Sequence, residues 1–201
     1  MANDNPSLLM WRPNAAVEEY TLPNGYQIRA MRRGEESAWC ACMLHDMGVE
    51  ELSCEQFIKK MGNESVREGY IYMVANERDE PVATATAQIK GENDPWLHMV
   101  SVKPTERGKK LAKPLVAAVL RRHMEEGRDG CYLFTQEYRT AAVKLYLDLG
   151  FLPVMNHPSY RVKFEQLAFD YGLPAIKCLD ENRRPCEDIL PKDHALVFGN
   201  N

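Results

Sequence analysis

The stretch that decides the fold is Val102–Pro114, VKPTERGKKLAKP, which places one glycine and several cations just before a segment with helical spacing. A helix N-terminus already carries a partial positive charge, so cations gathered there are favoured only when an anion lies among them. The cations are Lys103, Arg107, Lys109, Lys110 and Lys113. A glycine turn leading into a helix also aims backbone N–H groups at one point, so this stretch predicts a phosphate-binding site.

The flanking segments support a strand, a turn and a helix in that order. Residues 96–102, WLHMVSV, are short and mostly apolar or β-favouring, which predicts a buried strand. Apolar residues then recur at helical spacing over residues 111–120, and Gly127 is expected to end the helix. Proline is tolerated only in a first turn, so Pro114 predicts a helix start within residues 110–113. A solvated basic face is the alternative, and the order of elements favours the anion site.

Composition limits the classes of function. A chain of 201 residues with 45% hydrophobic content can bury one sizeable core, and its net charge of −4 argues against nucleic acid as a partner. The chain has neither an apolar run of transmembrane length nor a signal peptide, so we expect a cytoplasmic protein without a membrane partner. The six cysteines contain no C-x-x-C pair and are expected to be reduced thiols. Cys42, His45 and Asp46 share one helical face, but they lack a fourth ligand, so no metal is predicted.

Hydrophobic periodicity predicts alternating strands and helices in the rest of the chain. Strands are expected at residues 26–33, 70–76, 81–90, 131–136 and 151–155, and helices at 35–47, 53–61, 141–149 and 160–171. This order predicts an α/β (α+β) domain over residues 1–155, of which about the first 25 form a leader. Residues 156–201 are expected to be a C-terminal extension that covers the same domain or pairs two chains into a homodimer.

Two motifs in the expected order resemble the Gcn5-related N-acetyltransferase (GNAT) superfamily. The first is the coenzyme A pyrophosphate loop, R/Q-x-x-G-x-G/A after a strand ending in V-x-P, which residues 102–112 match except at Lys110, where the family usually has glycine. The second is N-x-x-A-x-x-L-Y-x-x-x-G-F, which residues 139–151, RTAAVKLYLDLGF, match except at Arg139. The resemblance covers about residues 26–155. It implies a central mixed, mostly antiparallel sheet with helices on both faces.

The resemblance also implies acetyl-CoA as the cofactor and assigns residues that bind it. They are Val100, Val102, Arg107, Gly108, Lys109, Lys110, Leu111, Ala112, Arg139 and Tyr146. Backbone groups of Val100 and Val102 are expected to pair with the pantetheine arm. Because backbone N–H groups hold the pyrophosphate, the loop can bind with lysine at position 110, although its Cβ is expected to push the pyrophosphate outward.

Two side chains are candidates for the proton transfers that acetylation of an amine requires. Tyr146 stands where the family places its general acid; the alternative is a tyrosine packed under the cofactor. His98 is the candidate base, because the strand resembles that of family members in which a His-x-His pair relays the substrate proton through water. Strand parity groups His98 with Trp96, Val100 and Val102. The alternative for His98 is a structural histidine in a core strand.

The acceptor is expected to be an amine. In the family, substrates enter near the loop between the first two helices and the ends of the central strands, where this chain has Glu50, Glu51, Trp96 and Glu137. Carboxylates beside an aromatic ring suit a cationic amine, and exposed acids without a role are the alternative.

The sequence therefore predicts an acetyl-CoA-dependent N-acetyltransferase that acts on a primary amine of a small molecule or peptide by direct attack in a ternary complex. A non-catalytic or regulatory module that binds acyl-CoA is the first alternative. A nucleic-acid-binding protein that uses the basic cluster is the second, and it would lose affinity steeply with salt.

Overall fold

A computed structural model describes residues 6–48, 51, 53–61 and 66–192. The chain forms two compact units, and each is described by itself. Unit 1 comprises Met1–Arg12 and Tyr132–Asn201, and unit 2 comprises Pro13–Cys131.

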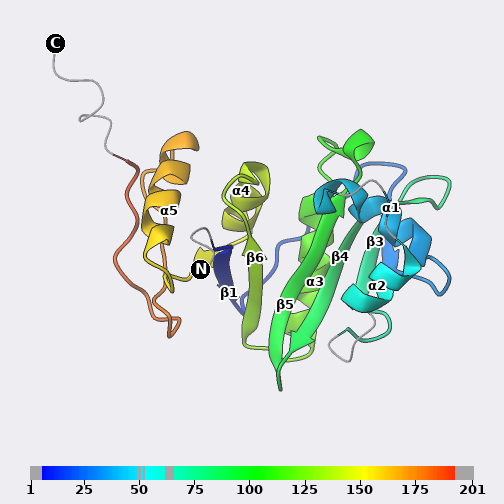
Figure 1. The fold of residues 1–201 in the computed structure, drawn as a ribbon, viewed down its shortest axis with the longest axis horizontal. Helices are drawn as coiled ribbons and strands as arrows, with labels where there is room; N and C mark the ends of the chain where they lie inside the picture. The colour runs from blue at the N-terminus through cyan, green and yellow to red at the C-terminus, as the bar shows by residue number, and fades with distance from the viewer. Residues whose placement is uncertain (1–5, 49–50, 52, 62–65, 193–201) are drawn as a thin grey trace, which may run out of the picture. The chain divides into compact units, whose positions relative to one another are not determined.

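Unit 2 contains a four-stranded antiparallel arrangement with helices on both faces (Figure 1). Its strands are β2 (Gln27–Ala30), β3 (Ile71–Ala75), β4 (Pro81–Lys90) and β5 (Asp94–Val102), in that spatial order. Its helices are α1 (Glu36–Met47), α2 (Cys54–Met61), the short 3-10 helix η1 (Pro104–Glu106) and α3 (Ala112–Glu125). The predicted strand and helix types in this part of the chain are confirmed, with ends that differ by up to three residues.

Neighbouring residues of β3 point to opposite faces of the sheet. Met73 is fully buried in the cluster formed with α1 and α2, whereas the hydroxyl of Tyr72 accepts a hydrogen bond from Arg122 Nε of α3 at 2.9 Å. Side chains alternate along a strand, so α1 and α2 cover one face and α3 covers the other.

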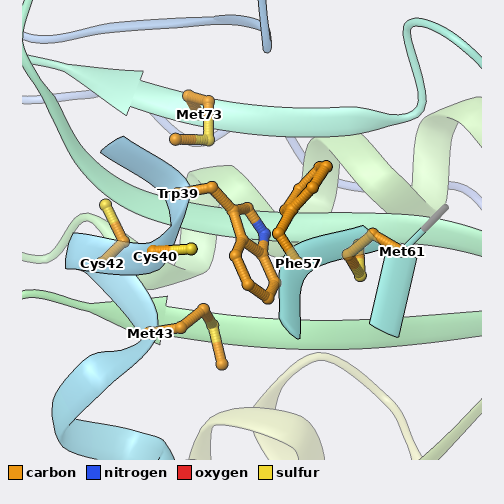
Figure 2. Close-up of a cluster of buried hydrophobic side chains, with 7 residues drawn as sticks. All are labelled: Trp39, Cys40, Cys42, Met43, Phe57, Met61 and Met73. Atoms are coloured by element: carbon orange, nitrogen blue, oxygen red, sulfur yellow. The ribbon is translucent and has the colours of Figure 1, made fainter. Parts of the chain in front are cut away.

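The core beneath α1 and α2 is rich in aromatic and sulfur-containing side chains (Figure 2). Trp39 is fully buried, and its ring meets Phe57 of α2 edge-on with centroids 5.0 Å apart. The cluster consists of Trp39, Cys40, Cys42, Met43, Phe57, Met61 and Met73. This packing attaches both helices to the sheet and so holds the loop after β5 against α1 in a defined place.

Strand β5 contains a bulge that the sequence pattern does not reveal. Ser101 pairs with Thr84 and His98 pairs with Thr86, so β5 has one more residue than β4 between these pairs. The extra residue lies at Met99, whose φ is +49°.

The predicted side-chain parity of β5 is therefore wrong beyond the bulge. Directly paired residues share a face, so His98 lies on the same face as Ser101, whereas Val102, which pairs with Ala83, lies on the opposite face. One inserted residue reverses every later position because the side-chain period of a strand is two.

Unit 1 contains most of β6 (Gly130–Thr135) and of β1 (Leu8–Pro13) and all of β7 (Leu152–Pro153), in that spatial order. Helix α4 (Thr140–Asp148) lies between β6 and β7 in the chain, and α5 (Ser159–Asp170) follows. Strand β1 falls within the segment expected to be a leader, yet it pairs with β7 and its residues Leu8 and Met10 are fully buried. No helix in the described ranges has the length and apolar character needed to cross a bilayer.

Candidate functional site

The loop between β5 and α3 has the backbone of an anion nest. Gly108 and Lys110 have φ values of +81° and +61°. Positive φ at alternate residues turns neighbouring N–H groups toward one side of the loop, which creates a concave site for an anion. A Cβ added to Gly108 would point into open space, so glycine is favoured here by φ and not by a neighbouring side chain.

Helix α3 begins at Ala112, as Pro114 predicted, and leaves its first turn open. Leu111 occupies the cap position, is buried and makes no side-chain cap, and the first turn contains no acidic residue. The N–H groups of that turn are therefore free of side-chain acceptors from the helix itself. Together with the nest at Gly108 and Lys110, this end of α3 fits a pyrophosphate group.

Arg107 is held at the start of the loop by α1. Its Nη2 donates to Asp46 Oδ1 at 3.0 Å and its Nε donates to the carbonyl of Val102 at 3.1 Å. Ser101 Oγ contacts the second carboxylate oxygen of Asp46 and lies 2.6 Å from the carbonyl oxygen of Cys42. These contacts connect the loop to α1 and to the end of β5, so the guanidinium has a defined position before any ligand binds.

Lys109 is held on the other side of the loop. Its ammonium donates to Glu106 Oε2 at 2.9 Å and to Tyr26 Oη at 3.1 Å, and Tyr26 Oη donates to the same carboxylate oxygen at 2.6 Å. The hydrogen bonds from Tyr26 and Lys109 lower the pKa of Glu106, and those to Tyr26 and Glu106 raise the pKa of Lys109. The predicted cation cluster is thus partly balanced by Asp46 and Glu106, and the net charge of these side chains stays positive.

The residues predicted for the acetyl-transfer side of unit 2 lie around the β5 bulge. His98 is half-buried and precedes the bulge, and the register of β5 against β4 shifts between the pair His98–Thr86 and the pair Ser101–Thr84. Val100 lies within the bulge, whereas Val102 pairs with Ala83, and the contact of these two backbones with the pantetheine arm stays a prediction. The bulge is what separates these two predicted cofactor contacts.

The ring of Trp96 on β5 is in contact with a lysine side chain of the neighbouring strand β4. The ammonium of Lys90 lies 3.9 Å from the centroid of the Trp96 ring, and burial lowers the pKa of Lys90. This face of the Trp96 ring is therefore occupied by a cation of the chain itself, and its contact with a substrate amine stays a prediction. Of the two loop acids predicted beside it, Glu51 is exposed and Glu50 lies outside the described residues.

The other predicted site residues belong to unit 1. Tyr146 on α4 is 7% exposed, and its ring packs edge-on against Phe151 with centroids 5.8 Å apart. Arg139 occupies the cap position of α4, with its guanidinium 5.8 Å from the ring centroid of Tyr138. Glu137 forms an ion pair with Lys163 of α5 at 3.1 Å, so its carboxylate already has a cationic partner.

Three residues that support the loop were not predicted as part of the site. The sequence pattern places Asp46 on a helical face with Cys42 and His45, Tyr26 at the start of a predicted strand, and Ser101 within the predicted strand of residues 96–102. Tyr26 and Asp46 reach the loop through tertiary contacts with Glu106 and Arg107, and Ser101 supports it through Asp46. Residue spacing within one segment does not indicate contacts of this kind.

Comparison with known proteins identifies a family whose model covers the loop between β5 and α3. The model of the Acetyltransferase (GNAT) family matches residues 29–151. A mycothiol acetyltransferase from Thermobispora bispora is 40% identical over 67 residues, which are 32% of this chain and 23% of that protein. The chain therefore spans about a quarter of the length of this curated relative.

Solved structures share the fold at low identity. A GCN5-related N-acetyltransferase from Sphaerobacter thermophilus aligns with a TM-score of 0.63 and 19% identity, over 73% of this chain and 48% of that chain. An aminoglycoside N-acetyltransferase in complex with CoA aligns with a TM-score of 0.52 and 20% identity, over 65% of this chain and 91% of that chain. The family match extends from within β2 to the residue before β7 and includes both motifs, and the protein therefore belongs to the GNAT acetyltransferase family.

Proposed function

We propose that this protein is an acetyl-CoA-dependent N-acetyltransferase that acetylates a primary amine of a small molecule or peptide by direct attack in a ternary complex. The observation that carries the proposal is the left-handed backbone at Gly108 and Lys110, directly before the uncapped N-terminus of α3. This geometry occurs at the position where the family binds the pyrophosphate of its cofactor. Residue Lys110, where the motif departs from glycine, keeps the backbone conformation that glycine favours.

Acetyl-CoA, when bound, supplies the acetyl group as an activated thioester. The N–H groups of residues 108–112 would hold its pyrophosphate, with Arg107 and Lys109 alongside. The backbone at Val100, which lies in the β5 bulge, would hold the pantetheine arm. These residues bind and orient, and binding of this kind accounts for the positioning part of the rate enhancement.

The chain's own side chains would move the two protons. An imidazole nitrogen of His98 would take a proton from the attacking amine, directly or through water, so that the nitrogen can form the new amide bond. The hydroxyl of Tyr146 would donate its proton to the departing thiolate sulfur.

The first test is the thermal stability of the protein with coenzyme A. A ligand that binds only the native state raises the melting temperature in a concentration-dependent way, and Gly108→Asp should abolish this shift by placing a carboxylate in the nest. Gly34→Asp is a matched control, because Gly34 also has a positive φ of +87° and open space at its Cβ position. No shift for the wild-type protein at millimolar coenzyme A contradicts the proposal.

The second test is release of free thiol from acetyl-CoA with a panel of amines, polyamines and peptides. Thiol release that depends on an amine, with the acetylated amine identified by mass spectrometry, supports catalysis. Binding of coenzyme A without turnover on the panel would favour the non-catalytic acyl-CoA-binding module. Binding to nucleic acid that weakens steeply with salt would favour the second alternative.

A further inference from the structure

Two thiols face each other in the C-terminal part of unit 1. The sulfur atoms of Cys178 and Cys186 lie 3.1 Å apart, and the N–H of Cys186 donates to the carbonyl of Cys178 at 3.2 Å. An antiparallel bridge between Leu179 and Pro185 makes Cys178 and Cys186 directly opposite neighbours on a hairpin. Opposite residues of an antiparallel pair have Cα atoms about 4.5–5.5 Å apart, which is within the range that a disulfide spans.

The turn of this hairpin is held by groups other than the thiols. Asp180 Oδ1 accepts hydrogen bonds from the N–H groups of Asn182 at 2.9 Å and Arg184 at 2.8 Å. The N–H of Asp180 donates to the carbonyl of Arg184 at 2.8 Å. Backbone and carboxylate contacts therefore hold the two strands together, and the approach of the sulfurs follows from them.

The hairpin is also anchored to the sheet of unit 1. Leu179 pairs with Val154 in a parallel bridge; its N–H donates to the carbonyl of Pro153 at 2.9 Å, and its carbonyl accepts from Met155 at 2.7 Å. Leu179 packs with Trp11 and Val154 in a buried cluster. A bond across the hairpin would consequently hold a segment that covers this edge of the sheet.

The two thiols differ in their access to solvent. Cys178 is 2% exposed, and burial raises its pKa to about 12, whereas Cys186 is half-buried. Thiol exchange begins at an accessible sulfur, so Cys186 is the one that a reagent meets first. Cys40, Cys42 and Cys131 are also buried, and they are correspondingly protected from such a reagent.

We propose that Cys178 and Cys186 form a redox site that closes to an intramolecular disulfide by exchange with a small-molecule disulfide such as oxidised glutathione. The Cys186 thiolate attacks one glutathione sulfur, forms a mixed disulfide and releases the first glutathione thiolate. The Cys178 sulfur, after loss of its proton to solvent, attacks the Cys186 sulfur and releases the second. The protein loses two electrons and two thiol protons, and one glutathione disulfide becomes two glutathione thiols.

The bond that forms would suppress opening of the hairpin. It closes a short loop between directly opposite residues, so it restricts the open state while the native contacts of Leu179 and the turn at Asp180 remain. Amide hydrogen exchange of Cys186, Ile189 and Met155 should therefore slow by at least about tenfold on oxidation. The N–H groups of these three residues donate across the hairpin or to it.

The test treats the full chain with oxidised glutathione and maps thiols by alkylation and mass spectrometry. The wild-type protein should lose the free thiols at positions 178 and 186 together, with a 178–186 disulfide peptide that dithiothreitol reverses. Cys178→Ala should stop at a glutathione adduct on Cys186. Cys186→Ser replaces the half-buried thiol and should leave Cys178 reduced, with unchanged hydrogen exchange under oxidant.

Two results would overturn the proposal. One is a wild-type protein that accumulates the glutathione adduct at Cys186 while Cys178 stays free. The other is a 178–186 disulfide that forms only between molecules, shown by a dimer on non-reducing gels. Circular dichroism of each variant before oxidation shows whether it is folded, and Cys186→Ser tests the site if Cys178→Ala does not fold.

Discussion

Lys110 holds a backbone conformation that glycine adopts without strain. Its φ of +61° lies in the left-handed region, which costs an L-residue with a Cβ about 1–2 kcal/mol. Strain of this kind persists where the surrounding structure requires it, and here it gives the loop its concave face. The departure from the family motif at position 110 thus changes a side chain while the path of the backbone stays suited to an anion.

Lys110→Gly should stabilise the protein. Removing the Cβ relieves the left-handed strain, and the greater entropy of glycine in the unfolded chain offsets part of the gain, so we expect the free energy of unfolding to rise by about 0.5–1 kcal/mol. Urea denaturation measures the change. Lys110→Ala is the control, because it also removes the charge but keeps the Cβ; an equal rise in both variants would assign the effect to charge instead of strain.

Tyr146→Phe should lower turnover by about 10²-fold and leave coenzyme A affinity nearly unchanged. The hydroxyl is the only group removed, and the ring keeps its contact with Phe151. Single-turnover kinetics with an identified acceptor, together with a coenzyme A titration, separates the two quantities. Turnover equal to wild type would mean that water or another group protonates the thiolate.

His98→Gln should remove the acidic limb of the pH profile. Protonation of an imidazole base at low pH lowers kcat/KM, and glutamine keeps a similar size and hydrogen-bonding capacity without titrating near neutrality. The measurement is kcat/KM against pH for both proteins with one amine. If the limb is the same in both, His98 is a structural histidine and proton removal belongs to another group.

At the level of elements, α3 is joined to β5 by a buried histidine. His123 is 2% exposed, and its Nε2 lies 3.2 Å from the carbonyl oxygen of Trp96, to which it donates. Burial lowers the pKa of His123 below that of an unfolded histidine, despite the hydrogen bond to Trp96, which raises it. Between the two pKa values the unfolded chain binds more protons, so stability falls as the pH drops through this window.

His123→Gln should therefore make the free energy of unfolding less dependent on pH. In the wild-type protein, neutral His123 contributes fully to the free energy of unfolding above about pH 6.5. Below this pH, its effect lowers the free energy of unfolding by up to about 1.4 kcal/mol per pH unit. The difference in unfolding free energy between the two proteins, measured by urea from pH 7.5 to 5, isolates this residue from the other histidines. A difference that does not change with pH contradicts the assignment.

At the level of the whole molecule, the C-terminal segment is part of the core of unit 1. Ile176, Leu179 and Ile189 are each less than 7% exposed, and Leu179 packs on Trp11 of the N-terminal strand β1. Segments from both ends of the chain thus contribute to one hydrophobic cluster. The contacts of these residues lie within unit 1, and the pairing of two chains through this segment stays a prediction.

Leu179→Ala should lower the free energy of unfolding by about 2–5 kcal/mol, because it removes buried methyl groups and leaves a cavity. Leu190→Ala, at a position that is 63% exposed in the same segment, should change it by less than about 0.5 kcal/mol. Equilibrium denaturation of both variants makes the comparison. Equal effects would mean that the segment does not pack on unit 1 in solution.

The sequence by itself determined the loop, α3 and most of the other elements, because their signals are local. A glycine turn, a proline confined to a first turn and apolar spacing act within a few residues, so Val102–Pro114 specifies its own strand end, nest and helix start. The family motifs lie in this local part of the chain and in α4.

Only the tertiary structure decided the features that depend on partners far away in the chain. Strand β1 forms because β7 pairs with it, the bulge at Met99 appears only against the register of β4, and Asp46 reaches Arg107 from another element. The two thiols of Cys178 and Cys186 meet because a hairpin turn sets their register. Which strands and which charged groups pair depends on all the groups that the fold brings close together. The spacing of residues within one segment does not determine these partners.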